Sequence, residues 1–323
     1  MTTQPPVPGP HPGGHPPLDV QRLRTHPLAK RKNLVTHKDF ASLVEPGKEL
    51  GRFLASFPNL LAGKDFRALV AAIVAARRNH REVVVAYGAH VLKTGCSPIL
   101  VDLIERGIVT AVATPGGGAI HDYELSMIGE TSEDVAASLE DGSFGMAEET
   151  AKAMGLAFKE GARTGHGLGG YLGTLIHTEK NPHQNLSVLA AAARKGIPAT
   201  VHVAIGTDTV HMHPEISGRA LGESSLLDFR ILCGVVSRLE GGVWINLGSA
   251  VILPEVFLKA LTVARNLGHP VRRFTAANLD LQQHYRPRVN VLARPKGEAI
   301  ALTGPHEILL PLLRAAILCD MGA

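Results

Sequence analysis

The stretch VTAVATPGGGAIHDYE, residues 109–124, passes from β-branched and small apolar residues into three glycines, and then reaches His121, Asp122 and Glu124. Its apolar part predicts a strand that is buried on both faces, as in a parallel sheet covered by helices. Glycines at the end of such a strand let a ligand approach the backbone, and a following helix offers free N–H groups to a phosphate. The stretch lacks the GxGxxG fingerprint of dinucleotide-binding folds. Many glycine-rich turns only connect a strand to a helix, so this spacing alone leaves the function open.

Strand-like and helix-like segments alternate around this stretch. The β-branched runs predict strands at 82–88, 108–114, 197–206, 242–248 and 271–281. Helical spacing and capping residues predict helices at 66–79, 97–107, 131–142, 146–162, 169–179, 186–196, 226–241 and 254–268, of which 131–142 opens with a Thr131–Asp134 capping box. This alternation predicts an α/β fold: a Rossmann-like, doubly wound, mainly parallel sheet with helices on both faces. Ligands of such sheets bind at the carboxyl ends of the strands.

The composition indicates one large domain. We expect residues 1–18, which are rich in proline and glycine, to be disordered, and residues 19–323 to form a single domain. No apolar run is long enough to span a membrane, no secretory signal is visible, and three scattered cysteines form no disulfide framework, so we predict a cytoplasmic protein. Aromatic residues make up 4% of the chain, which offers no stacking platform for nucleic acid. We interpret the basic run at 22–33 as a solvated leader.

Three histidines in VHVAIGTDTVHMHP, residues 201–214, raise the question of a metal. His202, His211 and His213 beside an aspartate have the chemistry of zinc ligands, which leaves a metal-dependent hydrolase as an alternative. We prefer to interpret them as polar residues lining a site or as buried imidazoles, and we predict no metal. Asp208 follows a predicted strand, where an acid often binds a ribose hydroxyl, although capping of the next turn explains it equally well.

The block YGAHVLKTGCSPILVDLIERGIVTAVATPGGGAIHDYELSMIGETSEDV, residues 87–135, resembles the corresponding block of deoxyhypusine synthase and its bacterial homologues. The segments IPATVHVAIGTDTVHMHP, GGVWINLGSAVILPEVFLKAL and FTAANLDLQQHYRP follow in that family's order, and the bacterial deoxyhypusine-synthase-like branch is the more similar one. The resemblance implies a homotetramer with NAD near the dimer interface. It also implies that NAD oxidises an amine of spermidine to an imine. An aminobutyl unit then passes through an enzyme lysine to a small amine or a protein lysine.

Carried onto this chain, the resemblance implies three groups of site residues. The cofactor-binding residues are His90, Lys93, Thr94, Gly95, Thr114, Gly116, Gly117, Asp208, Gly248, Ser249, Thr275 and Ala276. The substrate-binding residues are His121, Asp122 and Asp280, and the catalytic residues are His213, Glu255 and Lys296. We therefore predict an NAD-dependent aminobutyl transferase acting on a polyamine. A non-catalytic NAD-binding homologue that has lost the imine-forming lysine stays open as an alternative.

Overall fold

The computed structural model of the protein describes residues 20–322, so the predicted disordered tail at 1–18 lies outside the described residues. Its elements are η2 (Val20–Arg22), η3 (Leu28–Lys30), β1 (Asn33–Thr36), η4 (His37–Asp39), α1 (Lys48–Ala55), α2 (Leu61–Arg78), β2 (Val83–Tyr87), α3 (Ala89–Lys93), α4 (Ser97–Glu105), β3 (Ala111–Pro115), α5 (Gly116–Ile128), β4 (Glu130–Glu133), α6 (Val135–Glu140), α7 (Glu148–Thr164), α8 (Gly167–Thr178), η5 (Gln184–Leu186), α9 (Val188–Lys195), β5 (Ala199–His202), η6 (Thr209–Met212), α10 (Gly218–Val236), β6 (Val243–Leu247), α11 (Ile252–Asn266), β7 (Thr275–Asp280), η7 (Pro287–Ala293), β8 (Glu298–Thr303) and α12 (His306–Met321). The segment η7 is a π-helix.

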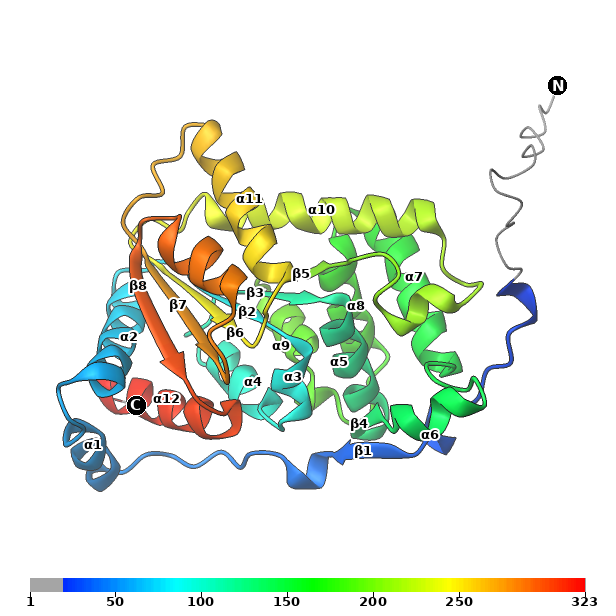
Figure 1. Ribbon diagram of the computed structural model, residues 1–323, viewed down its shortest axis with the longest axis horizontal. Helices are drawn as coiled ribbons and strands as arrows, with labels where there is room; N and C mark the ends of the chain where they lie inside the picture. The colour runs from blue at the N-terminus through cyan, green and yellow to red at the C-terminus, as the bar shows by residue number, and fades with distance from the viewer. Residues whose placement is uncertain (1–19, 323) are drawn as a thin grey trace.

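A six-stranded sheet with the order β5-β3-β2-β6-β7-β8 forms the centre of the molecule (Figure 1). Every neighbouring pair in it is parallel. The chain enters this sheet at the central strand β2 and moves outward through β3 to β5. It then returns to the centre and forms β6, β7 and β8 on the other side of β2. This is the order of a doubly wound Rossmann-like sheet, and the order reverses between β2 and β6. The fold class predicted from the sequence is confirmed.

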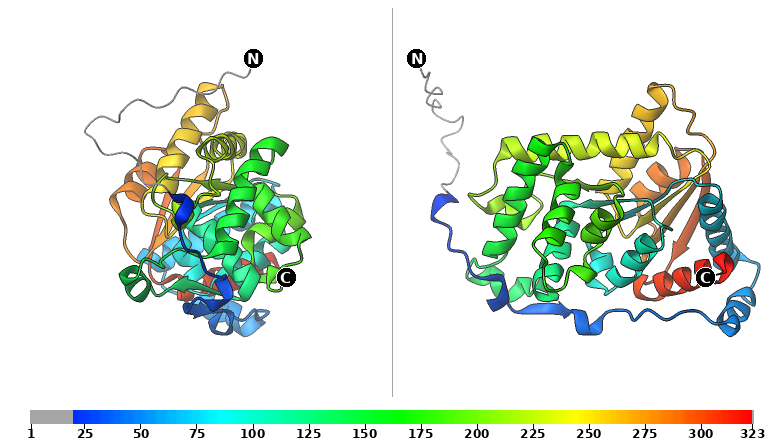
Figure 2. Two further views of the ribbon diagram at one scale, coloured as in Figure 1. Left: turned by 90° about the vertical axis from the view of Figure 1, so that its right-hand side faces the viewer. Right: turned by 180° about the vertical axis from the view of Figure 1, so that it is seen from behind.

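The two faces of the sheet bury separate hydrophobic clusters, because successive side chains of a strand point to opposite faces. In β2, Val83 and Val85 belong to the cluster beneath α2, α4 and α12, whereas Val84 belongs to the cluster beneath α10 and α11. Figures 1 and 2 show these helices on the two sides of the sheet. In the second cluster Trp244 of β6 stacks on Phe257 of α11, with ring centroids 4.1 Å apart. Both faces are therefore covered, which explains the continuous apolar runs in the sequence.

Several elements differ from those predicted. The three glycines after β3 are the first turn of helix α5 and not a loop. Asp134 caps the short helix α6 by accepting a hydrogen bond from Ala137 N, and Thr131 lies in β4, so the predicted capping box is wrong. The strand β8 and the helix α12 were not predicted. Within residues 20–322 no helix is long and apolar enough to cross a bilayer.

The N-terminal segment packs along the rest of the molecule. Its strand β1 pairs antiparallel with β4, and Figure 1 shows the segment as the blue chain running beside α6 and onward to α1. Leu28 is buried, and its backbone N–H donates to Glu149 of α7 at 2.7 Å. Arg31 is also buried, so the basic run at 22–33 is only partly solvated. This part of the chain belongs to the candidate site described next.

Candidate cofactor and substrate site

The carboxyl ends of the central strands meet by direct backbone contact. Gly88 follows β2 and Gly248 follows β6, and a Cβ on Gly88 would lie 2.2 Å from the carbonyl oxygen of Gly248. Ser249 is buried beside this contact and accepts a hydrogen bond from Leu253 N, which anchors the start of α11. The backbone of Gly88 and Gly248 thus closes the space between the ends of β2 and β6. Two cavities near this end of the sheet share Lys93, the last residue of α3, in their lining.

The glycines at the start of α5 make room for side chains of this protein. A Cβ on Gly116 would lie 2.0 Å from Asp208 Oδ2, and a Cβ on Gly118 would lie 1.9 Å from Thr114 Oγ1. Only Gly117 of the three has room for a side-chain carbon, because an added Cβ would make ordinary contacts of 3.7 Å with Asp208 and 3.9 Å with Ala89. The interpretation that all three glycines leave space for a dinucleotide is therefore corrected: two of them admit Asp208 and Thr114.

Asp208 belongs to the segment between β5 and η6, and its side chain lies against Gly116 in the first turn of α5. It lines a cavity of about 230 Å³. Burial raises the pKa of this carboxyl to about 6, against the opposing effect of a hydrogen bond from the Gly117 backbone N–H. Lys93, Gly117, His121 and Asp208 all line this cavity, so the fold brings together four of the predicted site residues that come from three separate segments. A partly buried acid at this position can accept hydrogen bonds from hydroxyl groups.

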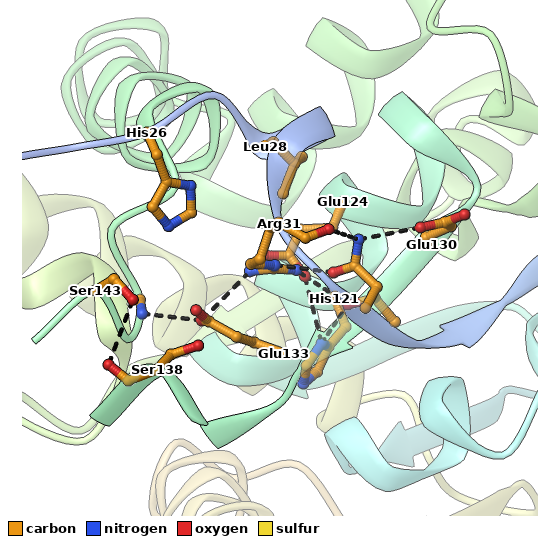
Figure 3. Close-up of polar contacts among 12 residues, drawn as sticks. His26, Leu28, Arg31, His121, Glu124, Glu130, Glu133, Ser138 and Ser143 are labelled. Carbon is orange, nitrogen blue, oxygen red and sulfur yellow. Dashed lines mark hydrogen bonds and ion pairs between the residues drawn. The ribbon is translucent and has the colours of Figure 1, made fainter. Parts of the chain in front are cut away.

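A buried ion pair forms one wall of the same cavity (Figure 3). The Arg31 guanidinium donates to both carboxylate oxygens of Glu124, at 2.8 Å and 2.7 Å, and both side chains are almost fully buried. Thr131 Oγ1 donates to Glu124 at 2.5 Å, so His121 Nδ1, 2.6 Å from the same hydroxyl, acts as the donor to it. Burial opposes ionisation of Glu124, yet the interactions with His121 and Arg31 outweigh it and lower the pKa to about 2.

Glu133 adds a second carboxylate to this wall. Its Oε2 accepts a hydrogen bond from Gly145 N at 2.9 Å and lies 3.8 Å from the Arg31 guanidinium. Its Oε1 is buried and has no hydrogen-bond partner within the described chain. Since Arg31 is already engaged with Glu124, the cavity has an excess of acceptors, which suits a ligand that carries hydrogen-bond donors or positive charge.

A second cavity of about 280 Å³ lies on the other side of Lys93, which lines both. Thr94 and Gly95 also line it, together with Leu34 and Phe40 from the N-terminal segment. Gly95 has a φ of +74°, and a Cβ there would lie 3.1 Å from the Cα of Phe40. Each cavity is slightly smaller than the about 300–1,000 Å³ typical of small-molecule sites, and the two together fall within that range.

A histidine pair lies at the same edge of the sheet. His90 of α3 and His306, the first residue of α12, have ring centroids 5.9 Å apart. Burial and the neighbouring His306 lower the pKa of His90, and the charge of Asp280 at the end of β7 acts on it in the opposite direction. His306 is buried, with Nε2 3.2 Å from the carbonyl oxygen of Leu279 and with Nδ1 unpaired within residues 20–322.

Three predicted site residues lie at the end of the sheet where the strands begin, opposite the end that carries the two cavities. Thr275 and Ala276 are the first residues of β7, and Lys296 precedes the first residue of β8. Because the strands are parallel, their amino ends are separated from the cavities by the length of the sheet. The candidate site is corrected accordingly: it does not include Thr275, Ala276 or Lys296.

Three further predicted residues are engaged in structural contacts. Asp122 is fully buried and accepts hydrogen bonds from Ser187 and from the first backbone N–H groups of α9, and burial raises its pKa to about 6. His213 is buried with Nε2 2.7 Å from the carbonyl oxygen of Gly145. Glu255 lies on the first turn of α11 and contacts Lys259, Asn290 and Arg286. The roles predicted for Asp122, His213 and Glu255 are therefore corrected, since none of the three lines the two cavities.

The histidines of 201–214 have separate partners. His202 Nε2 lies 3.0 Å from Thr200 Oγ1, and burial lowers the pKa of His202 to about 3. His211 Nδ1 accepts hydrogen bonds from the backbone N–H groups of Gly206 and Asp208. No group of three or more His, Cys, Asp or Glu side chains in the described part of the chain is placed to hold a metal ion. His202, His211 and His213 are therefore not gathered into a common cluster.

Sequence reasoning missed Arg31, Glu124, Glu133 and His306. A signal existed for Glu124, because it follows Gly117 and His121 at helical spacing and so lies on the same face of α5. Arg31 is 93 residues away from Glu124 along the chain, and no local pattern connects them. His306 follows the turn residues Gly304 and Pro305 and belongs to no motif, so nothing in the sequence distinguished it.

Comparison with known proteins places the fold but not the family. No protein-family model matches the sequence, and no curated protein matches it significantly. A conserved LOR/SDH protein from Methanococcus maripaludis S2 aligns with 87% of this chain and 70% of its own at 14% identity, with a TM-score of 0.51. AgrE, in a complex with ornithine and NAD⁺, aligns with 87% of this chain and 35% of its own at 15% identity and a TM-score of 0.51.

A protein assigned as a deoxyhypusine synthase from Entamoeba histolytica aligns with 86% of this chain and 98% of its own. The identity is 11% and the TM-score 0.45, a score at which we draw no conclusion. The likenesses to the LOR/SDH protein and to AgrE show that the chain shares its fold with other Rossmann-like proteins.

Proposed function

We propose that the protein binds NAD in the two cavities beside Lys93 and uses it to transfer an aminobutyl unit from a polyamine. The observation that carries the proposal is that Lys93, Gly117 and Asp208 converge on one cavity at the carboxyl edge of a doubly wound sheet. In this arrangement Asp208 would accept hydrogen bonds from a ribose. Bound NAD would supply the hydride acceptor.

The charges of the first cavity support a cationic substrate. The Arg31 guanidinium is hydrogen-bonded to Glu124 and lies 3.8 Å from Glu133, and Asp208 forms no ion pair with an arginine or lysine among residues 20–322. We propose that these carboxylates orient an ammonium group of the polyamine. His121 lines this cavity, and because its Nδ1 donates to Thr131, its Nε2 would accept the proton that the amine loses as its carbon gives up a hydride.

The lysine that forms the enzyme-bound imine has to reach the cavity that holds the substrate. Lys296 lies at the far edge of the sheet, whereas Lys93 lines both cavities. We therefore assign to Lys93 the attack on the substrate imine: its Nζ would bond to the imine carbon while the diamine leaves. Lys296 lies far from the two cavities, and this separation also favours a second candidate function: an NAD-binding homologue without transferase activity.

We also propose a homotetramer, in which a second copy covers the cavities. Exposed apolar side chains line them: Leu34 of the second cavity is 59% exposed and Val135 of the first is 45% exposed. Exposed apolar groups gathered around a site are typical of a protein–protein interface. Sedimentation velocity tests this part directly, and a monomer at micromolar concentration would contradict it.

Titration calorimetry with NAD tests the cofactor site. We expect Asp208→Asn to weaken NAD binding by about tenfold or more, since it removes the acceptor of charge-assisted hydrogen bonds. Asp320→Asn, an exposed aspartate at the end of α12, is the matched control and should bind as the parent protein does. Absence of any binding of NAD or NADH by the parent protein would refute the proposal. Release of a diamine from spermidine, followed by mass spectrometry, then separates the transferase from the non-catalytic homologue.

A further inference from the structure

A hollow of about 470 Å³ lies at the amino ends of β6, β7 and β8, at the edge of the sheet opposite the proposed NAD site. In Figure 1 the hollow lies at the tails of the arrows that mark β7 and β8. Arg272, Arg273 and Lys296 line the hollow, and the Arg81 side chain lies beside Gly241 at its border. A space of this size falls within the range of small-molecule sites.

Most of these cations lack a carboxylate partner. Arg81, Arg272 and Lys296 are exposed and form no ion pair within residues 20–322. Arg273 pairs with Glu240, and that carboxylate is further occupied by the backbone N–H groups of Arg272 and Arg273. Glu298 is the one acid among the described residues that lines the hollow, and its Oε2 is 3.4 Å from Thr275 Oγ1. The hollow therefore has an excess of positive charge.

The backbone at Lys296 adds a second, independent feature. Lys296 has a φ of +62°, in the left-handed region that residues other than glycine rarely adopt. The backbone N–H groups of Lys296 and Gly297 have no hydrogen-bond partner in the described structure. Successive free N–H groups next to a left-handed residue form a concave donor site for anions, known as a nest.

We propose that this hollow binds a phosphate-bearing small molecule. The free N–H groups of Lys296 and Gly297 would hold phosphate oxygens, and the Lys296 ammonium and the Arg272 guanidinium would balance the charge. The remaining volume would take the organic part of the ligand. The site is separate from the proposed NAD site, so its occupation does not depend on the proposed function.

Titration calorimetry with inorganic pyrophosphate and with ATP, at low salt, tests the proposal. Lys296→Gly removes the ammonium but keeps the left-handed backbone and both N–H groups, because glycine adopts this conformation freely. We expect Lys296→Gly and Arg272→Ala each to weaken binding by about tenfold or more. Arg219→Ala, which removes an equally exposed cation on α10, is the matched control and should leave binding unchanged. Tighter binding of ATP than of pyrophosphate would identify a nucleotide, and equal binding would identify the phosphate groups alone.

A second comparison distinguishes binding in this hollow from binding at the proposed NAD site. Asp208→Asn should retain pyrophosphate binding, and Lys296→Gly should retain NAD binding. The proposal is overturned if millimolar pyrophosphate and ATP produce no heat with the parent protein. It is equally overturned if Lys296→Gly and Arg272→Ala bind both as tightly as the Arg219→Ala control.

Discussion

Replacing Arg31 by methionine removes the cation from the most deeply buried ion pair of the candidate site. Methionine keeps much of the length and apolar volume of the side chain, so the change is mainly one of charge and hydrogen bonding. The side chains of Arg31 and Glu124 are 6% and 2% exposed, so Glu124 would be left buried with Thr131 Oγ1 as its hydrogen-bond donor and His121 3.7 Å away. Removing one partner of a buried pair typically destabilises a protein by about 3–5 kcal/mol.

The pKa of Glu124 gives a second value for the stability that depends on its ionised carboxylate. It lies at about 2 in the folded protein, against an ordinary value of 4.5. At about 1.4 kcal/mol for each pH unit, this difference corresponds to roughly 3 kcal/mol of stability, which the interactions with His121 and Arg31 provide together. Because the folded-state pKa is depressed, the contribution is complete above pH 4.5 and is lost as the pH falls towards 2.

Urea unfolding followed by circular dichroism measures the effect. At pH 7 we expect Arg31→Met to lower the free energy of unfolding by about 3 kcal/mol. The difference from the parent protein should shrink as the pH falls from 4.5 towards 2. Arg219→Met is the control: its pair with Glu223 is exposed, so its stability should differ from the parent by less than about 0.5 kcal/mol. A loss below about 1 kcal/mol at pH 7 for Arg31→Met would refute this account of the ion pair.

Two further substitutions test the packing around the strands. Gly118→Ala places a Cβ 1.9 Å from Thr114 Oγ1, and we expect a loss of about 1–3 kcal/mol in thermal or urea unfolding; an unchanged stability would contradict this close approach. Asp228 is buried and accepts hydrogen bonds from the backbone N–H groups of Gly169 and Val201, while burial raises its pKa to about 7. Because the folded-state pKa is raised, Asp228 makes the protein less stable as the pH rises from about 4 to 7, and Asp228→Asn should flatten this part of the stability profile; an identical profile in the variant would count against it.

The alternation of elements could be predicted from the sequence because it depends on local patterns. The runs 82–88 and 242–248 are apolar at consecutive positions, which marks strands covered on both faces, and they became β2 and β6. Edge elements were less predictable. β8 has the burial pattern of a half-exposed strand and follows a π-helix, so its sequence lacks the signal of a central strand.

The candidate site was predicted in part, from residues near the ends of strands. Lys93, Gly117, His121 and Asp208 meet at one cavity because parallel strands bring their carboxyl ends to the same edge. Asp122 lies one residue from His121, yet the helical turn directs it to the start of α9, where it caps backbone N–H groups. The position of a residue near a loop therefore did not determine which way its side chain points.

By itself the sequence determined the fold class and the alternation of the central strands and helices, because hydrophobic period and capping are properties of neighbouring residues. Only the tertiary structure decided which distant groups meet: Arg31 with Glu124, Asp208 with Gly116, and Lys296 with the amino ends of β7 and β8. Such contacts depend on strand direction and on how helices pack over the sheet, and a side chain carries no local sign of the partner that packing will bring to it.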